Sequence, residues 1–283
     1  MAAPFIFRED TLRDQVVFIT GGATGLGYAM AERMARCGAH LVLASRNVDR
    51  CTAAATALSE QFGIRAVASQ LDVRDSASVA AAFQDATGAL GPVDILVNNA
   101  AGNFYFPTAE LSDGQWNAVL GIDLFGTFNC SRAAFGHLKD RGGVIINISA
   151  TLQYTGWPGM APASAAKAGI DALTKTTALE WGRYGIRVNA IAPGGIPTEG
   201  VLKAFRAGRE SFDATGDRIP IGRVGRPEDI ADMAVFLCSP AASWITGAIM
   251  VVDGGAQLTR LGGMDLQALD RVADQMRQEK DVP

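Results

Sequence analysis

Three glycines in one short segment have the spacing to bind a phosphate group. The segment Thr20–Gly27 contains Gly21, Gly25 and Gly27, and it lies between an apolar run and an amphipathic stretch. Glycines permit a tight turn, and the free N–H groups and dipole of a following helix favour a pyrophosphate. The spacing differs from G-x-G-x-x-G, so the position between strand and helix carries the prediction. The expected dinucleotide contacts in this segment are Gly21, Gly22, Ala23, Thr24, Gly25, Leu26 and Gly27.

The second expected strand ends in a residue pair that bears on which dinucleotide binds. Ser45-Arg46 offers no Asp or Glu for a ribose 2′-hydroxyl, whereas Arg46 can pair with a 2′-phosphate. The sequence therefore favours NADPH, with Ser45 and Arg46 as contacts. A solvent-exposed role for Arg46 remains open, because neither Ala23 nor Thr24 adds a basic residue to the glycine segment.

Three further strand ends carry residues suited to a dinucleotide. Asp72 follows the third strand, where it can accept from the adenine amino group. Small residues at 99–101 leave room for a ribose after the fourth strand, and 193–196 follow the sixth near the expected nicotinamide amide. Ligands bind at the carboxyl ends of strands in open α/β sheets. The expected contacts are Asp72, Val73, Asn99, Ala100, Ala101, Pro193, Gly194 and Ile196.

Seven short apolar runs alternate with amphipathic stretches along the chain. This alternation predicts an α/β fold, a single Rossmann-type doubly wound parallel sheet with helices on both faces. Expected helices include Leu26–Cys37, Trp116–Leu138 and Ala163–Tyr184, whereas Glu199–Pro220 lacks a strand signal and is expected to form a flap. The expected strands are Val16–Thr20, Leu41–Ser45, Ala66–Leu71, Ile95–Asn98, Val144–Ile148, Val188–Ala192 and Ile249–Val252.

Length and composition are typical of one domain. With 283 residues, 48% of them hydrophobic, the chain can bury one large core, and no repeat or linker divides it. We expect a single domain over 1–283, with its core at about 12–258 and a tail at 259–283. Apolar residues at helical spacing in the tail fit either a subunit contact or a frayed end; they are Leu266, Leu269, Val272 and Met276.

Charge and hydropathy argue against several classes of protein. A net charge of −4 and a pI of about 5.3 speak against nucleic-acid binding. No apolar stretch reaches the roughly 18 residues of a membrane span, and residues 1–14 lack a secretory pattern. The four cysteines have no metal-ligand spacing, which predicts free thiols, no metal site and a cytoplasmic location.

Taken together, the ordered motifs resemble those of a known family. Thr20–Gly27, Asn98–Gly102, Lys167 and Pro193–Gly194 resemble the short-chain dehydrogenase/reductase family over roughly Leu12–Leu258. A narrower set of motifs resembles the 2,4-dienoyl-CoA reductases, and their peroxisomal-type branch most of all. These motifs are Asn99–Phe104, Asp123 with Gly126–Asn129, Gly142–Ile145, Ala150–Leu152, Ser164–Ala168, Glu180–Gly182 and Asp253–Ala256.

Three positions depart from the ordinary pattern of the family. Position 163, four residues before Lys167, holds alanine where the family has a tyrosine. Position 150, thirteen residues before position 163, holds alanine where the family has a serine. Position 123 holds aspartate where the family has a helical asparagine. The mitochondrial-type branch carries a tyrosine at the position of Leu152 and a serine at that of Ala163, and this chain has neither. The resemblance therefore implies a reduction whose proton does not come from the usual tyrosine.

The resemblance also implies a reaction, hydride transfer from NADPH to a dienoyl-CoA in β-oxidation of unsaturated acyl chains, then protonation of the dienolate on carbon. Lys167 would hold the nicotinamide ribose, as a cofactor contact, and place a positive charge near the enolate. We hypothesise that Asp123 and Lys167 are the catalytic pair and deliver the proton through a water. A helix-kink or water-binding role for Asp123 remains an alternative, as do Tyr154 and Ser164 as substitute acids.

For the acyl-CoA, the resemblance implies Phe104 as a wall of the acyl pocket and Arg46, Arg74 and Lys203 near the CoA portion. Core packing remains open for Phe104, and a solvated surface position for the basic residues. A homotetramer is also implied. Two alternatives to the dienoyl-CoA reductase stay open. One is another enoyl-thioester or ketone reductase of the same fold, and the other is a non-catalytic NADP-binding protein.

Overall fold

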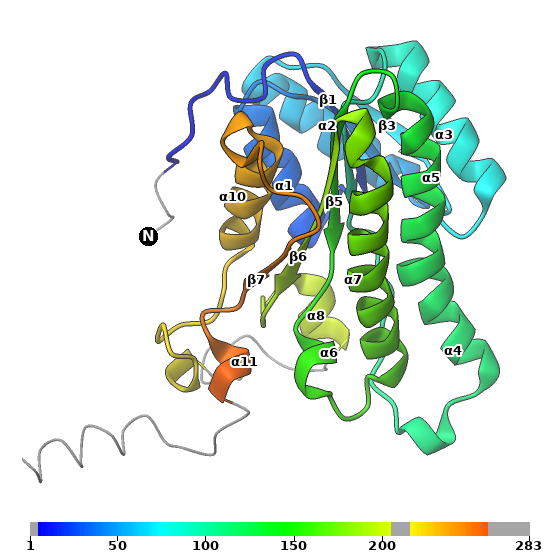
Figure 1. Ribbon diagram of the computed structural model, residues 1–283, viewed down its shortest axis with the longest axis vertical. Coiled ribbons are helices and arrows are strands. Elements are labelled where there is room, and N and C mark those ends of the chain that lie inside the picture. The colour runs from blue at the N-terminus through cyan, green and yellow to red at the C-terminus, as the bar shows by residue number, and fades with distance from the viewer. Residues whose placement is uncertain (1–4, 205–215, 260–283) are drawn as a thin grey trace, which may run out of the picture.

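A seven-stranded sheet forms the centre of the computed structural model, which describes residues 5–204 and 216–259 (Figure 1). All neighbouring strands are parallel, in the order β3-β2-β1-β4-β5-β6-β7. The strands are β1 (Val16–Thr20), β2 (His40–Ser45), β3 (Ala66–Gln70), β4 (Ile95–Asn98), β5 (Gly143–Ile148), β6 (Ile186–Pro193) and β7 (Ile249–Val252). This confirms the predicted fold class, and each predicted strand is present to within two residues at either end.

Helices cover both faces of the sheet (Figure 1). On one face lie α1 (Gly25–Arg36), α2 (Val48–Phe62) and α10 (Pro227–Cys238); on the other lie α3 (Ser76–Leu90), α5 (Gly126–Leu138) and α7 (Ala161–Trp181). Residues of β1 alternate between the two cores, Val17 and Ile19 in one and Val16 and Phe18 in the other. Both faces are buried, which explains why the strands are continuous apolar runs.

Shorter elements gather beyond the carboxyl ends of the strands. In Figure 1 the helices that follow β5, β6 and β7 all lie toward the lower end of the molecule. The short helices are α4 (Asp113–Leu120) after β4, α6 (Leu152–Thr155) after β5, α8 (Glu199–Ala204) after β6 and α11 (Ala256–Thr259) after β7. Single 3₁₀ turns also occur after β4, at Thr108–Glu110, and after β6, at Gly216–Arg218, whereas Gly182–Tyr184 and Pro240–Ala242 form such turns before β6 and β7. The loops that build a ligand site in an open α/β sheet are at this edge.

Two predicted helices differ from the observed ones in detail. The stretch Trp116–Leu138 is divided into α4 and α5 by a π-helical turn, Gly121–Phe125. The helix expected at Ala163–Tyr184 begins two residues earlier, and its last three residues form a 3₁₀ turn.

Two predictions fall partly or wholly outside the described residues. In the expected flap Glu199–Pro220, the described part contains α8 and a 3₁₀ turn and no strand, whereas 205–215 lie outside it. The apolar stripe from Leu266 to Met276 is wholly outside.

Candidate active site

The glycine segment after β1 leaves space and donors for a phosphate. Gly21 and Gly25 have φ of +64° and +55°, which favour glycine. A Cβ at Gly27 would lie 2.6 Å from Nδ2 of Asn99, so no side chain fits there. The first residue before α1, Thr24, makes no side-chain cap, and the first turn of α1 contains no acidic residue. The N–H groups of this helix end are therefore open to an anion.

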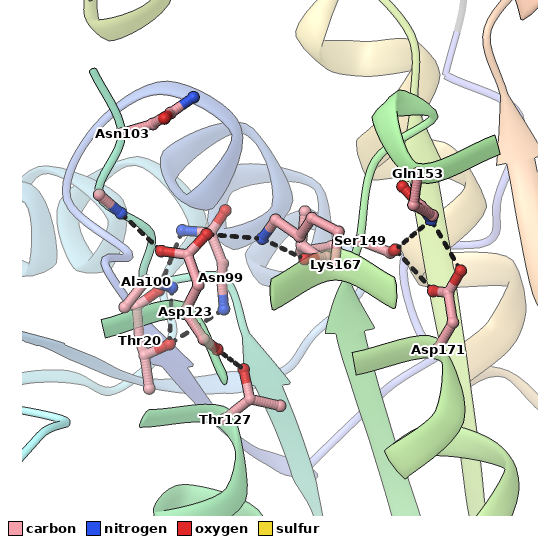
Figure 2. Close-up of polar contacts among 12 residues, drawn as sticks. Thr20, Asn99, Ala100, Asn103, Asp123, Thr127, Ser149, Gln153, Lys167 and Asp171 are labelled. Carbon is pink, nitrogen blue, oxygen red and sulfur yellow. Dashed lines mark hydrogen bonds and ion pairs between the residues drawn. The ribbon is translucent and has the colours of Figure 1, made fainter. Parts of the chain in front are cut away.

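Thr20 and Asn99 join the glycine segment to the end of β4. The Thr20 hydroxyl accepts from the backbone N–H groups of Asn99 and Ala100, both at 2.9 Å. The side-chain amide of Asn99 donates back to the Thr20 carbonyl at 2.9 Å and to that of Gly21 at 3.2 Å (Figure 2). Two predicted contact regions, far apart in sequence, thus form one surface.

Arg46, Asp72 and Arg74 form a charged cluster at the ends of β2 and β3. Arg74 Nε donates to the Asp72 carboxylate at 2.9 Å, and Arg46 is exposed nearby. Hydrogen bonds from Arg74, together with the charges of Arg74 and Arg46, lower the pKa of Asp72 to about 2. The predicted adenine contact thus shares its oxygens with Arg74, and the two guanidinium groups expected to contact phosphates lie at the same corner.

Asp123 and Lys167 meet in the interior of the site. The Lys167 Nζ lies 3.3 Å from the Asp123 Oδ2, and the two residues are 8% and 1% exposed. Lys167 also donates to the Ile148 carbonyl at 2.9 Å, and Asp123 Oδ1 accepts from the Gly102 N–H at 2.8 Å (Figure 2). Each charge therefore has an opposite charge and a backbone partner, as a buried ion pair requires.

The π-helical turn explains how Asp123 reaches this position. Such a turn inserts an extra residue into a helix and often marks a functional site. The hydroxyl of Thr127 donates to the Asp123 carbonyl at 2.6 Å, so that carbonyl keeps a partner where the regular helix is interrupted.

An apolar wall lies beside the ion pair. The buried residues Val119, Met160 and Ala163 contact one another, with the half-buried Phe104, Leu152 and Trp157 packed around them. Val119 precedes Asp123 by four residues and Ala163 precedes Lys167 by four, the spacing of neighbours on a helix face. Above this wall the loops 103–107 and 156–160 are joined, because Phe106 N–H donates to the Gly159 carbonyl at 2.9 Å.

The two alternative acids have other surroundings. The Tyr154 hydroxyl donates to Asp171 Oδ2 at 3.1 Å, and burial and then the charge of Asp171 raise the Tyr154 pKa to about 12. Ser164 Oγ is buried and has no hydrogen-bond partner within the described ranges. Tyr154 thus directs its proton to Asp171 and not to the pair of Asp123 and Lys167.

The remaining predicted contacts frame the site from β3 and β6. Val73 is buried against α5, where a Cβ at Gly126 would come within 2.5 Å of it. After β6, Gly194 approaches Asp253 so closely that a Cβ would lie 2.6 Å from the Asp253 Cβ. Of the last predicted positions, Pro193 ends β6, Ile196 is 4% exposed, and Ser45 is half-buried, while Ala101 and Lys203 are exposed.

Comparison with known proteins places this site in a family. The family model of the enoyl-(acyl carrier protein) reductases matches residues 21–257. A zebrafish (Danio rerio) peroxisomal 2,4-dienoyl-CoA reductase, named as (3E)-enoyl-CoA-producing, is 43% identical over 90% of this chain and 85% of its own. The chain belongs to the short-chain dehydrogenase/reductase family.

Solved short-chain dehydrogenase/reductase structures have the same fold. A short-chain dehydrogenase from Bacillus anthracis is 42% identical, with a TM-score of 0.76 over 87% of this chain and 97% of its own. A variant of actinorhodin polyketide ketoreductase with NADPH is 32% identical, with a TM-score of 0.81 over 86% and 97% of the two chains. A nicotinamide cofactor follows from membership of this family.

The structure adds polar residues that the sequence analysis did not assign to the site. Thr20 was only part of the glycine motif, although its hydroxyl fixes the β4 loop. Asp171 lies one helical turn after Lys167, a spacing that offered a signal, and it accepts hydrogen bonds from Ser149 and Gln153. In the described part of the chain no His, Cys, Asp and Glu cluster could hold a metal, and no helix there is long and apolar enough to span a membrane.

Proposed function

We propose that this short-chain dehydrogenase/reductase is an NADPH-dependent 2,4-dienoyl-CoA reductase acting in β-oxidation of unsaturated acyl chains. The observation that carries the proposal is the buried pair of Asp123 and Lys167 beside an apolar wall, with alanine at 163. A ketone requires an acid at its oxygen, whereas a dienolate can take its proton on carbon. The name of the zebrafish relative supports the same reaction.

The chain's residues fit the cofactor. The cradle at Gly27, the uncapped start of α1 and the exposed Arg46 suit a pyrophosphate and a 2′-phosphate. When bound, NADPH supplies the hydride. We assign the rest of its binding surface to the segments after β3, β4 and β6, with Asp72, Val73, Asn99, Ala100, Ala101, Pro193, Gly194 and Ile196.

Lys167 and Asp123 divide the remaining work. An ammonium has three N–H donors, and Lys167 directs one to Ile148 and one toward Asp123. The third is available to ribose hydroxyls or to a water, and the positive charge stabilises the dienolate. Asp123 and Lys167 then deliver a proton to carbon through a bound water, and the pair afterwards takes up one proton from solvent. The position of the product double bond stays open between carbons 2 and 3, because the zebrafish relative is named (3E)-enoyl-CoA-producing and a Bacillus subtilis relative is named (2E)-enoyl-CoA-producing.

We assign the substrate contacts to the apolar wall and to the charged cluster at the ends of β2 and β3. Phe104 packs against the wall formed by Val119, Met160 and Ala163, which suits an acyl chain. Arg46 and Arg74 at one corner, and Lys203 exposed on α8, suit the phosphates of CoA.

NADPH oxidation, followed by absorbance, tests the function. The purified protein is given a 2,4-dienoyl-CoA, the matched 2-enoyl-CoA and a 3-ketoacyl-CoA in separate assays. Rapid oxidation with the diene alone is the expected result, and NMR of the product locates the double bond. Faster turnover of the enoyl or keto substrate would show that the protein is another reductase of the same fold. NADPH binding with no turnover of any substrate would indicate a non-catalytic protein.

Assembly and location are part of the proposal. The exposed apolar residues Phe125, Phe128 and Leu179 on and beside α5 and α7, and Trp244 before β7, suit contacts in a homotetramer of a single domain. All four cysteines are free and buried, which fits a reducing compartment such as the cytoplasm. A fluorescent fusion in the native cell tests the location.

A further inference from the structure

A second buried carboxylate lies one turn beyond Lys167 on α7. Asp171 is 7% exposed, and within the described ranges no Lys or Arg forms an ion pair with it. It accepts instead from the hydroxyl of Ser149 at 2.6 Å, the amide of Gln153 at 2.7 Å and the hydroxyl of Tyr154 at 3.1 Å. A buried carboxyl group held only by neutral donors depends on all of them, because each oxygen left without a partner is costly.

All three donors belong to one short segment, residues 149–154, that borders the site. The residue before it, Ile148, accepts from Lys167, and Leu152 within it packs against the apolar wall. Figure 2 shows Gln153 and Asp171 on one side of Lys167 and Asp123 on the other. One carboxylate therefore fixes the segment that joins the ion pair to the apolar wall.

The orientation of Gln153 follows from its partners. The amide nitrogen of Gln153 faces Asp171, because it donates to the Oδ2 of that residue. That nitrogen also donates to the Ser149 hydroxyl at 3.1 Å. The amide oxygen, Oε1, is buried and has no hydrogen-bond partner in the part of the chain that the structure describes. A buried acceptor of fixed direction calls for a donor, and a ligand bound at the carboxyl ends of the strands can supply one.

We propose that Asp171 is a positioning residue that directs Gln153 Oε1 to accept a hydrogen bond from an amide N–H of a bound ligand. This inference rests on the proposed function, because that function supplies two ligands with such a group. The pantetheine arm of the acyl-CoA contains amide N–H groups, and the nicotinamide ring of NADPH carries a carboxamide. The two sources share one chemistry and are separated by experiment.

Gln153→Met tests the hydrogen bond to the ligand. Methionine keeps the length of the side chain and removes the acceptor, so binding of one ligand should weaken roughly tenfold. A higher KM for the dienoyl-CoA with an unchanged NADPH Kd identifies the pantetheine arm, whereas a higher NADPH Kd identifies the carboxamide. Gln84→Met, at an exposed position of α3, is the matched control. If KM and Kd both stay at their wild-type values, the contact does not exist.

Asp171→Asn tests the positioning role. Asparagine cannot accept from all three donors, so amide hydrogen exchange in 149–155 should become faster while exchange in β1 stays unchanged. Asp171→Asn should also change the same KM or Kd that Gln153→Met changes. Adding Gln153→Glu to Asp171→Asn should restore that constant in part, because the amide at 171 can then donate to the carboxylate at 153. A lower Tm with wild-type exchange and wild-type constants would show a merely structural role and overturn the proposal.

The two experiments separate this inference from the proposed function. Hydrogen exchange and the NADPH Kd need no acyl-CoA. If the wild-type protein does not reduce a diene, the proposed function fails while the exchange data still decide whether Asp171 positions the segment. Should Asp171→Asn fail to fold, Gln153→Met still tests the contact, because a methionine leaves the hydrogen bonds of Asp171 to Ser149 and Tyr154 in place.

Discussion

Asp123 is the residue at which a change of one atom alters the chemistry of the site. Its side chain is buried against Lys167 and the Gly102 N–H, so an oxygen at Oδ1 and a negative charge at Oδ2 have separate partners. An asparagine keeps the first partner and loses the second. The carboxylate is therefore suited to proton transfer together with the ammonium group, whereas an amide is not.

Asp123→Asn should lower kcat with dienoyl-CoA by on the order of 10²-fold or more, the usual contribution of a general acid. Removing one partner of a buried ion pair also costs stability, about 3–5 kcal/mol, so Tm is measured alongside. Asp85→Asn, an exposed change on α3, is the control and should keep wild-type kcat. Near wild-type turnover of folded Asp123→Asn would remove Asp123 from the mechanism.

At the residue scale, we predict that Arg46 sets the preference between the two nicotinamide cofactors. Its exposed guanidinium lies near Asp72 at the corner where a 2′-phosphate is expected. Arg46→Ala should weaken NADPH binding by about 1.5–3 kcal/mol, roughly 10- to 150-fold, and leave NADH binding unchanged. Titration by fluorescence measures both constants. Arg50→Ala, exposed on α2, is the matched control, and an equal loss for both cofactors would contradict the 2′-phosphate contact.

At the scale of elements, the strand ends were predictable, whereas the interruption of one long helix was not. The strands were predictable because residues buried on both faces of the sheet form continuous apolar runs, and the ends of such runs are clear in the sequence. The π-helical turn at Gly121–Phe125 could not be predicted, because its apolar residues still follow a helical period and the inserted residue shows only in the hydrogen bonds. The role of Asp171 could not be predicted for a similar reason, because its three hydrogen-bond donors come from a separate loop and show only in the structure.

The contact between the loops 103–107 and 156–160 depends on a glycine. Gly159 has φ of +77°, and a Cβ there would lie 2.6 Å from the ring of Tyr105. Gly159→Ala should separate the loops 103–107 and 156–160 and raise the KM for dienoyl-CoA several-fold, with the NADPH Kd unchanged. Gly156→Ala isolates the backbone effect, because Gly156 has φ of +71° but a Cβ there would meet nothing within 4 Å. Equal kinetic effects in the two variants would show that the ring contact is irrelevant.

Over the whole molecule, the most exposed apolar side chains point to assembly. Leu179 on α7 is 86% exposed, and it borders a surface hollow of about 370 Å³ that Phe135, Trp181 and Tyr184 help to line. Large exposed apolar groups beside a hollow are typical of protein interfaces. The extent of the single domain and the number of subunits remain predictions, because both depend on contacts between chains or on residues outside the described ranges.

Leu179→Arg should therefore break the proposed tetramer, since a buried unpaired guanidinium is unfavourable at an apolar interface. Light scattering after size-exclusion chromatography should give four times the 29.7 kDa chain mass for the wild type and a smaller particle for the variant. Ile6→Arg, at a residue 74% exposed near the N-terminus and away from α7, should keep the wild-type mass. A wild-type particle of one chain would contradict the tetramer, and an unchanged mass in Leu179→Arg would place the interface elsewhere, with Trp244 the next residue to substitute.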